Sequence, residues 1–395
     1  MPSPPAADPG PAGPVRVTLV LDVTAVGGAE IVLRDTFAAL DPARVVTDVV
    51  CLREPGPLAD DFAAVSDGVV TLPRAGRVDR LDKAGLLRVP RLARHFRRRR
   101  TDVVVVSHHH RAALTLARVA ARLTGRTRSV VAAHDMDLTR VGSRVLPRYV
   151  VETLFLSAGL ALLAPSQGRY LHEEEGVGAS WRSRVREYLV PNGIPAPLGA
   201  PAGRRAEVRA ELGVADDDVV VLMVARLSPQ KAHHVMLEAI TRAAHPRLRL
   251  VVVGDGKRRA ELEALVAEHG LGDAVTFLGL RRDVPRLLAG GDVFALSSVH
   301  EGVPISVIEA MTAGLPVVAT DVGALRDQVR EGEDGFLVPS GDAVALAERL
   351  TRLADDPALR RRLGEHARDR ARTEFTVENT AAAFTAMVES VARRC

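Results

Sequence analysis

The sequence is poor in the residues that mark several classes of protein. Aromatic residues make up 3% of its 395 residues, and its two cysteines are Cys51 and Cys395. Two cysteines cannot form a framework of disulfides, which favours a reducing compartment such as the cytoplasm. No aromatic residues alternate with the arginines and no nucleic-acid-binding motif occurs, so we expect no nucleic-acid partner.

We expect neither a transmembrane segment nor a secretion signal in this sequence. The most apolar stretch, Thr153 to Ala164, is too short to cross a bilayer and ends at Pro165. The opening residues, MPSPPAADPGPAGP, have no basic start and no apolar run, so we expect residues 1–14 to form a disordered tail rather than a signal peptide. We therefore expect a cytoplasmic protein, or one that is peripheral at the inner face of the membrane.

The residues that are abundant favour an α/β protein with two domains. Hydrophobic residues make up 47% of the chain and are mostly Val, Leu and Ala, which suits buried parallel strands. A strand at 15–23, a loop with Gly27 and Gly28, and a helix at 29–40 are typical of a doubly wound domain, although the three-glycine spacing of a dinucleotide site is missing. The same alternation begins again at 219–224, and the chain is long enough for two such domains.

A segment rich in Pro, Ala and Gly separates the two halves. We predict an N-terminal Rossmann-like domain at 15–195, a linker at 196–203 and a C-terminal Rossmann-like domain at 204–376. Residues 377–395 have the apolar spacing of an amphipathic helix, with Phe384 among the apolar residues.

Positive charge is concentrated in the N-terminal half. Residues 1–200 contain 27 Lys and Arg against 20 Asp and Glu, whereas residues 201–395 contain 26 against 29. The excess is greatest between Arg74 and Arg100, where residues 82–100 are predicted to form a basic helix with five apolar residues on one side. One interpretation is a surface that binds anionic lipid or a phosphorylated acceptor through Arg88–Arg100. The other is an ordinary solvated helix face.

Histidines follow two strands of the first half. Ser107–His110 comes after the apolar strand 103–106, and His134 comes after the strand 129–133. Ligands lie at this end of the strands in open α/β sheets. Three neighbouring histidines do not easily converge on one ion, and Asp135–Asp137 lacks the context of a manganese site, so we expect no metal. We interpret His134 as a neutral hydrogen-bonding group that faces the cleft between the domains.

Charged residues follow two strands of the second half. Arg226 and Lys231 share the loop after the strand 219–224, and Glu301 comes after the strand 293–296. Two cations at a strand end that face helix N-termini can bind a diphosphate. By themselves these cations could equally be ordinary surface charge.

A second glutamate, Glu309, lies eight positions after Glu301 across the start of a helix. Residues 301–304 include Gly and Pro and cannot lie inside a helix, and we expect the helix at 306–312. The backbone N–H groups between the two carboxylates have no partner within that helix. They can therefore bind an anionic or hydroxyl-rich ligand.

Together these motifs resemble the retaining glycosyltransferases of family four. The resemblance rests on VARLSPQKAHHVMLEAI, VVVGDGKRRAELEAL, VTFLGLRRDV, SSVHEGVPISVIEAM with its E-x7-E motif, and TDVGALRDQVREGEDGFLVPSGD, and it covers nearly the whole chain after the tail. The family has the GT-B architecture: two facing Rossmann-like doubly wound domains, an interdomain cleft and a C-terminal crossover helix. The resemblance implies that 377–395 packs back on the N-terminal, acceptor-side domain.

The resemblance also implies an activity and a role for each matching residue. A sugar would move from a nucleotide-diphosphate sugar, in UDP or GDP form, to an acceptor hydroxyl, with retained configuration and no metal or other cofactor. Arg226 and Lys231 would hold the diphosphate. Glu309 would bind the ribose, Glu301 would lie by the donor sugar, and His134 would lie by the sugar and the acceptor. The remaining contacts to phosphate, sugar or nucleobase would come from Gly27, Gly28, Gly254, Leu280, Val303, Pro304, Ile305 and Ser306.

Departures from the family pattern and alternative functions accompany this prediction. Ala225 and Ala232 replace common glycines, which we expect to cost little beyond a methyl group, and 324–327 replaces the commoner Gly-x-Pro-Glu. The acceptor could belong to cell-wall, exopolysaccharide or glycolipid synthesis, or be a small secondary metabolite. Another sugar-nucleotide enzyme of this architecture, or a non-catalytic sugar-nucleotide-binding protein, is the alternative.

Overall fold

The computed structural model describes residues 13–24, 27–53, 55–72, 87–107, 111–134, 140–141, 144–145, 157–173, 186–196 and 204–393. Most of the predicted tail and linker, together with His108–His110 and Asp135–Asp137, lies outside these described residues. The chain divides into two compact units. Unit 1 comprises Met1–Asn192 and Val377–Cys395, and unit 2 comprises Gly193–Thr376.

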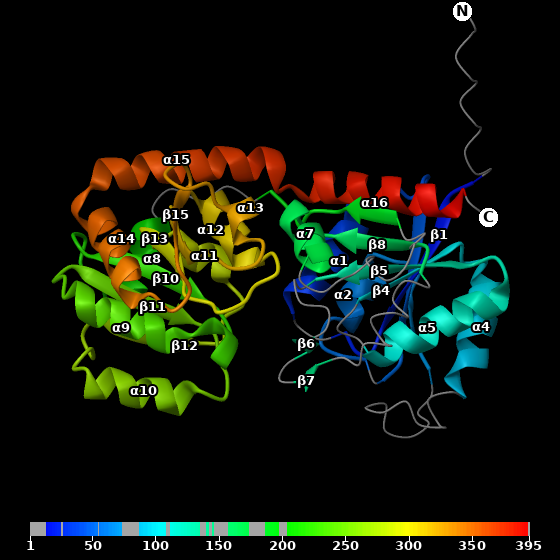
Figure 1. Cartoon of the computed structure of the whole chain (residues 1–395), viewed down its shortest axis with the longest axis horizontal. Helices are drawn as coiled ribbons and strands as arrows, with labels where there is room; N and C mark the ends of the chain where they lie inside the picture. Colours follow the sequence, from blue (N-terminus) through cyan, green and yellow to red (C-terminus); the bar gives the residue numbers. More distant parts are fainter. Residues whose placement is uncertain are drawn as a thin grey trace, which may run out of the picture. The chain divides into compact units, whose positions relative to one another are not determined.

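Unit 1 is built on a seven-stranded sheet in the order β3-β2-β1-β4-β5-β8-β9, in which every paired strand is parallel (Figure 1). Its elements are β1 (Val15–Leu21), α1 (Gly28–Ala38), β2 (Val45–Cys51), α2 (Ala59–Ala64), β3 (Val69–Thr71), α4 (Arg88–Arg99), β4 (Val103–Ser107), α5 (Arg111–Thr124), β5 (Arg128–Ala133), the short antiparallel pair β6 (Arg140–Val141) and β7 (Arg144–Val145), β8 (Gly159–Leu162), α7 (Pro165–Glu173), β9 (Arg186–Leu189) and α16 (Val377–Ala392).

Alternate residues of the central strands enter two separate cores. Leu19 and Leu21 of β1 pack with residues of α1, α2 and α16, whereas Val20 packs with residues of α4, α5 and α7. Successive side chains of a strand point to opposite faces of the sheet. When helices cover both faces, a central strand therefore needs apolar residues at odd and even positions alike. The continuous apolar run of β1 therefore follows from its central place in the sheet.

The last helix, α16, completes the core of unit 1. The ring of Phe384 lies edge-on to the ring of Phe37 in α1, with 5.9 Å between the ring centroids. Around this contact, Thr380 donates a hydrogen bond of 2.8 Å to the carbonyl oxygen of Pro191, and Arg44 forms an ion pair of 2.8 Å with Glu389. The helix is thus fixed by apolar packing along its length and by polar contacts at both ends.

Unit 2 repeats the arrangement with six parallel strands in the order β12-β11-β10-β13-β14-β15. Its elements are α8 (Arg204–Leu212), β10 (Val219–Val224), the 3-10 turn η1 (Pro229–Lys231), α9 (His233–Ala243), β11 (Leu248–Val253), α10 (Arg259–Glu268), β12 (Val275–Gly279), α11 (Val284–Leu288), β13 (Val293–Leu296), α12 (Ile305–Ala313), β14 (Val317–Thr320), α13 (Leu325–Gln328), β15 (Gly335–Val338), α14 (Ala343–Asp355) and α15 (Pro357–Glu374). The two parallel sheets confirm the predicted α/β fold class with Rossmann-like halves.

The strand order of unit 2 identifies the edge of the sheet at which a ligand is expected. From β10 the chain adds β11 on one side of the sheet and β13 on the other, so the order reverses between β10 and β13. Open α/β sheets bind ligands beyond the carboxyl ends of the strands at such a switch point. The loops that follow β10 and β13 carry Arg226, Lys231 and Glu301.

The basic helix predicted at 82–100 is α4, of which residues 88–99 are helical, and its two interpretations, a lipid-binding surface and a solvated face, stay open. Val89, Leu92 and Phe96 of this helix are buried in the core with α5. They face the protein core, and four of the five exposed residues of α4 are arginines. No helix among the described residues is long and apolar enough to cross a membrane.

Candidate functional site

Lys231 and Glu301 meet in an ion pair beyond the carboxyl ends of β10 and β13. The ammonium Nζ of Lys231 lies 2.5 Å from Oε1 of Glu301, and the hydroxyl of Ser298 donates to the same oxygen at 2.5 Å. The Glu301 side chain is 5% exposed and the Lys231 side chain 15%. A carboxylate this deeply buried is stabilised by the opposite charge and the hydroxyl donor. The structure thus brings two of the predicted residues together.

The two loops are also joined through Gln230. Its side-chain Nε2 donates to the backbone carbonyl oxygen of His300 at 2.9 Å. The backbone carbonyl oxygen of Gln230 accepts from the backbone N–H of Val299 at 2.8 Å. These bonds hold the two loops side by side. Reasoning from the sequence missed Gln230, because a glutamine in a loop is usually solvated.

Small hydroxyl residues at the ends of β13 and β14 were missed as well. Ser297 and Ser298 follow β13, Thr320 ends β14, and all three are fully buried. Thr320 donates to the carbonyl oxygen of Ser298 at 2.6 Å. The hydroxyl of Ser297 lies 3.1 Å from the carbonyl oxygens of both Lys231 and Ala232. Hydroxyl residues directly after buried strands are the sequence signal that could have found them.

The backbone conformation of Ala232 contradicts the expectation that alanine in place of glycine costs little stability there. Its backbone is in the left-handed region, with φ 44° and ψ 44°. An L-residue there costs about 1 kcal/mol more than glycine because Cβ crowds the backbone. Ala225, in contrast, has no positive φ, so the original expectation stays in place for that position.

Glycines let the loops after β10 and β11 pack against each other. A Cβ added to Gly254, whose φ is 141°, would clash with the carbonyl oxygen of Ala225. The backbone N–H of Leu227 donates to the carbonyl oxygen of Asp255 at 3.0 Å. Gly254 is therefore required for close packing between backbones, and its predicted contact with a nucleotide stays a prediction.

The start of α12 presents backbone donors beside Glu301. No side chain caps this helix, and its N-cap residue is Pro304, whose carbonyl oxygen accepts from Nε2 of the buried Gln328 at 3.2 Å. Val303 is buried, whereas Ile305 and Ser306 are half-buried. Glu309 lies half-buried one turn further along the helix. An uncapped helix N-terminus favours an anionic or hydroxyl ligand.

Arg226 and Leu280, two further predicted residues, are both exposed. Within the described part of the chain, the guanidinium of Arg226 has no ion-pair partner, so it is open to a ligand from solvent. Leu280 follows β12 and is 74% exposed. The loop after it is fixed by Arg281, whose hydrogen bonds lower the pKa of Asp283 to about 2.

His233 is a titratable group that the sequence reasoning did not single out. It is the first residue of α9 and is 2% exposed, and its ring nitrogens have no hydrogen-bond partner among the described residues. Burial, together with the neighbouring positive charges of Lys231 and Arg258, lowers its pKa to about 4. His233 is therefore neutral at physiological pH beside the charged lysine.

The predicted residues of unit 1 occupy a different setting. Gly27 is the N-cap of α1 and Gly28 is its first residue. A Cβ added to Gly27 would clash with the carboxylate of the buried Glu30. Both ring nitrogens of His134 are buried, and the residue lines a cavity of about 30 Å³ with Asn192, Thr380 and apolar side chains. Their predicted contacts with donor and acceptor stay predictions.

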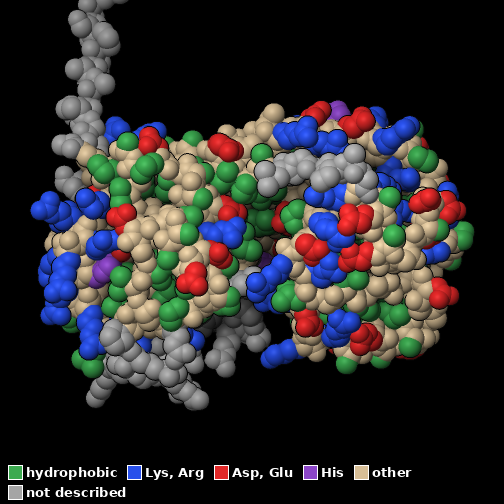
Figure 2. Space-filling view, turned by 180° about the vertical axis from the view of Figure 1, so that it is seen from behind, with side chains coloured by type: hydrophobic (Ala, Val, Ile, Leu, Met, Phe, Trp, Pro, Cys, Tyr) green, Lys and Arg blue, Asp and Glu red, His purple; other side chains and the backbone are tan. Residues whose placement is uncertain are grey.

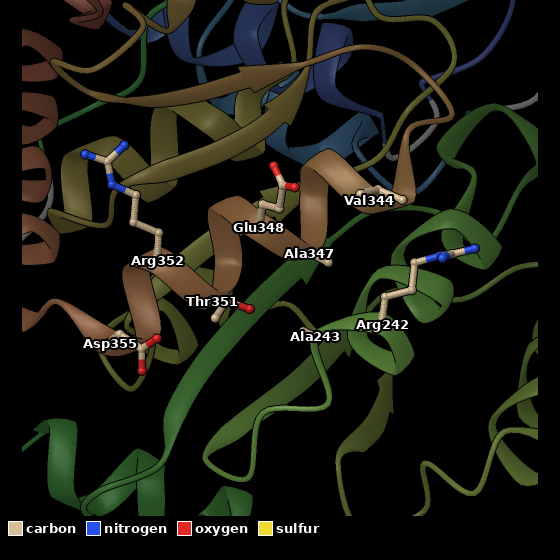
Figure 3. A pocket seen from close by; sticks show the side chains of 8 residues that line it. All are labelled: Arg242, Ala243, Val344, Ala347, Glu348, Thr351, Arg352 and Asp355. Atoms are coloured by element: carbon tan, nitrogen blue, oxygen red, sulfur yellow. The ribbon is translucent and has the colours of Figure 1, made fainter.

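One surface hollow of unit 2 is separate from this site. It has a volume of about 770 Å³ and lies between α9 and α14. Arg242 in its wall is near the C-terminal end of α9, about 15 Å along that helix from Lys231. Figure 3 shows the side chains of Arg242 and Arg352 pointing in opposite directions, so the hollow offers no convergent cations for an anion.

No group of three or more His, Cys, Asp or Glu side chains that could hold a metal ion occurs in the part of the chain that the structure describes. The groups that the described loops present are cations, a carboxylate and backbone donors. Lys231 and Arg226 can bind phosphate oxygens, Glu301 can accept from hydroxyl groups, and α12 can supply N–H donors.

Two family models match the chain and together cover most of it. The model described as Glycosyltransferase Family 4 matches residues 26–195, and the model described as glycosyl transferases group 1 matches residues 204–370. The second match contains the loops that hold Arg226, Lys231 and Glu301.

Curated proteins of this kind are similar in sequence. EpsF of Bacillus subtilis, which is named as a glycosyltransferase, is 31% identical over 317 residues, or 78% of this chain and 79% of EpsF. The α-D-kanosaminyltransferase of Streptomyces kanamyceticus is 36% identical over 169 residues, or 42% of this chain and 43% of that protein. The chain spans about half the length of several other curated relatives that it matches.

Solved structures share the fold. HepE of Anabaena, in a complex with UDP and glucose, is 22% identical with a TM-score of 0.78, and the match covers 95% of this chain and 100% of that one. A likeness at this identity concerns the fold alone, and it confirms the GT-B fold class.

Proposed function

This chain belongs to the group 1 glycosyltransferases, and we propose that it transfers a sugar from a nucleotide-diphosphate sugar to a hydroxyl group of an acceptor. The observation that carries this proposal is the pairing of Lys231 with Glu301 at the switch point of unit 2, with Arg226 in the same loop as Lys231. These residues combine cations for a diphosphate with an acceptor for sugar hydroxyls.

Lys231 has binding capacity left for a phosphate group. An ammonium carries three N–H donors, and within the described residues Lys231 uses one of them, toward Glu301. The remaining donors and the exposed guanidinium of Arg226 can take the oxygens of the donor diphosphate. Negative charge increases on the diphosphate as the bond to the sugar breaks, so fixed cations stabilise the transition state more than the ground state. In this scheme the two cations do the work of a metal ion.

The proposed reaction retains the anomeric configuration. The acceptor oxygen forms a bond to the anomeric carbon on the face from which the diphosphate departs. The bond from that carbon to the phosphate oxygen breaks, and the departing phosphate takes the proton of the acceptor hydroxyl. Glu301, whose Oε1 is engaged by Lys231 and Ser298, serves to bind sugar hydroxyls rather than to attack.

The donor that we propose to test first is a UDP-sugar. HepE, which shares the fold, was solved with UDP and glucose, and this supports UDP over GDP as the first candidate. Glu309 would bind the ribose, and the loops at Gly254 and Leu280 would lie by the nucleobase. The acceptor is proposed to be a glycan or glycolipid hydroxyl. The similarity to a kanosaminyltransferase favours a small molecule as the second candidate.

The test measures nucleotide binding and donor turnover. We expect UDP to raise the melting temperature and to bind in calorimetry, and a panel of UDP-sugars to be hydrolysed or transferred slowly. Lys231→Ala should lower turnover about 10²–10³-fold, as removal of one charge-stabilising donor does. It also leaves the buried Glu301 carboxylate with Ser298 as its side-chain donor, so the melting temperature should fall, and turnover is compared at a temperature at which the variant is folded. Arg242→Ala, at the other end of α9, removes an exposed cation and should leave turnover unchanged.

Two outcomes would contradict this proposal. Near-normal turnover of Lys231→Ala would remove Lys231 from the chemistry. Binding of UDP without turnover of any sugar donor, in the presence of glycan, lipid and small-molecule acceptors, would instead favour a non-catalytic sugar-nucleotide-binding protein.

A second surface, on α4 and α5 of unit 1, is proposed to contact anionic lipid. Figure 2 shows Lys and Arg side chains gathered at the edge of unit 1, on the left of that view. The exposed arginines of α4 are Arg91, Arg94, Arg97 and Arg98, and Nη2 of Arg97 donates to the carbonyl oxygen of Leu123 in α5 at 2.6 Å. Leu123 is itself 55% exposed. Each arginine near an anionic membrane contributes about 1 kcal/mol, so binding is expected to be electrostatic and salt-sensitive.

Co-sedimentation with vesicles tests this surface. Phosphatidylserine vesicles should bind the protein and phosphatidylcholine vesicles should not, and the variant R91Q/R94Q/R98Q should lose binding. The matched control is R361Q/R362Q/R372Q, which removes three exposed arginines from α15 of unit 2. Equal loss in both variants would show an effect of net charge alone, and no binding by the wild type would leave α4 as a solvated face.

A further inference from the structure

Ser297 connects the strand before Glu301 to the backbone of the Lys231 loop. It follows β13 and is fully buried. Its hydroxyl oxygen lies 3.1 Å from the carbonyl oxygen of Lys231 and 3.1 Å from that of Ala232. The next residue, Ser298, bonds to the carboxylate of Glu301. Two consecutive hydroxyls therefore hold the ion pair: Ser297 holds the backbone at Lys231, and Ser298 holds the side chain of Glu301.

The two carbonyls that Ser297 contacts belong to the peptide groups on either side of Ala232. The orientation of these two peptide planes defines the φ and ψ angles of Ala232, which are 44° and 44°. This left-handed conformation is unfavourable for an alanine and persists where the surroundings enforce it. A hydroxyl proton shared between both carbonyls is such a constraint, and Ala232 is completely buried against it.

We propose that Ser297 is a positioning residue that holds Ala232 in the left-handed conformation and so sets where the Lys231 ammonium lies. The inference rests on the proposed function, in which Lys231 binds the donor diphosphate. Relaxation of Ala232 to the right-handed region would change φ by about 100°. The peptide group that carries Lys231 would turn with it, and the ammonium would leave its place beside Glu301.

A double-mutant experiment on UDP binding tests this role. Ser297→Ala removes the hydroxyl and is expected to weaken UDP binding about fivefold in calorimetry, the effect of one lost hydrogen bond. Ala232→Gly removes the cost of the left-handed conformation, so the double variant S297A/A232G should bind UDP within about twofold of the wild type. Ser297→Thr keeps the hydroxyl and should also bind like the wild type.

The control is the alanine at the other end of the same helix. Ala244, the C-cap of α9, also has φ 44°, and it lies far from Lys231 along the helix. Ala244→Gly relieves the same kind of conformation and should not restore UDP binding to Ser297→Ala. Equal rescue by Ala244→Gly, or unchanged UDP binding by Ser297→Ala, would overturn the proposal.

Urea unfolding separates failure of this inference from failure of the proposed donor. If the wild type binds neither UDP nor GDP, the proposed donor is wrong, and the Ser297–Ala232 coupling is decided by stability alone. Ala232→Gly should then raise the urea midpoint less in Ser297→Ala, where Ala232 has already relaxed, than in the wild type, where Ser297 enforces the left-handed conformation. Equal increases in the two backgrounds would overturn the coupling.

Discussion

Two of the buried ion pairs in unit 2 differ in how completely their cations are hydrogen-bonded. Arg370 of α15 donates to the carboxylates of Asp334 and Glu374 at 2.5 and 2.9 Å, and to the carbonyl oxygens of Gln328 and Asp327 at 2.6 and 2.7 Å. Lys231, among the described residues, has the single partner Glu301. A cation whose N–H donors are engaged by several protein acceptors stabilises the packing of secondary structure. A cation at a strand end with N–H donors left over can bind a ligand.

The location of the two pairs agrees with this distinction. Asp334 and Arg370 are 1% and 8% exposed and join α13, α15 and the turn before β15. Lys231 and Glu301 lie in loops at the switch point of the sheet, where ligands bind in open α/β proteins. The same kind of contact therefore serves stability in one place and is proposed to serve donor binding in the other.

The largest expected effect is on stability, and it concerns Arg370. Arg370→Ala leaves the carboxylate of Asp334 buried without its cation, so the free energy of unfolding should fall by about 3–5 kcal/mol. Urea unfolding measures this, and Arg362→Ala, an exposed arginine of the same helix, should change little. A stability loss of the same size in Lys231→Ala would erase the difference between the two pairs.

A smaller effect, on the acid dependence of stability, is expected from His233 beside Lys231. The pKa of His233 is about 4 in the folded protein, against about 6.5 for an unperturbed histidine. As the pH falls below 6.5, the unfolded chain binds a proton that the folded protein does not bind until about pH 4. This group therefore costs stability as the pH falls from 6.5 to 4, by about 2 kcal/mol at pH 5.

His233→Leu should remove this part of the acid dependence. Unfolding free energies measured at pH 7 and pH 5 should differ less in the variant than in the wild type. His234→Leu, which removes the exposed neighbouring imidazole, should leave the difference unchanged. An unaltered acid dependence in His233→Leu would show that charge is tolerated next to Lys231, and the Lys231 site would then resemble a solvated surface more than a binding site.

The fold could be predicted from the sequence to a large extent. Apolar β-branched runs such as β1 and β10 alternate with helical spacing, and these patterns determine parallel sheets covered by helices. The loops with Lys231 and Glu301 could be identified by their position after such strands. That the two side chains form an ion pair required the order of the strands in space, which local spacing does not contain.

The remaining contacts of the site depend on tertiary structure. Ser297 and Thr320 resemble ordinary turn residues in the sequence, and their hydrogen bonds exist only because β10, β13 and β14 are neighbours. The backbone angle of Ala232 cannot be inferred from a residue that favours right-handed helices. In α4, one amphipathic pattern suits both a core face and a membrane face, and only the packing against α5 distinguishes them.

The last and smallest expected effect separates the two members of the Lys231–Glu301 pair. Glu301→Gln keeps the shape of the side chain and removes its charge, so Lys231 is freed from its partner. UDP contains the diphosphate but no sugar, so its affinity should be unchanged or increased, because the carboxylate no longer competes for the ammonium. Turnover of the sugar donor should fall about tenfold, or about 1.4 kcal/mol in the barrier, because Glu301 is proposed to bind the sugar hydroxyls. If Glu301→Gln weakened UDP binding as much as Lys231→Ala, Glu301 would act by holding the lysine in place, and the pair would be structural in the same sense as Arg370 and Asp334.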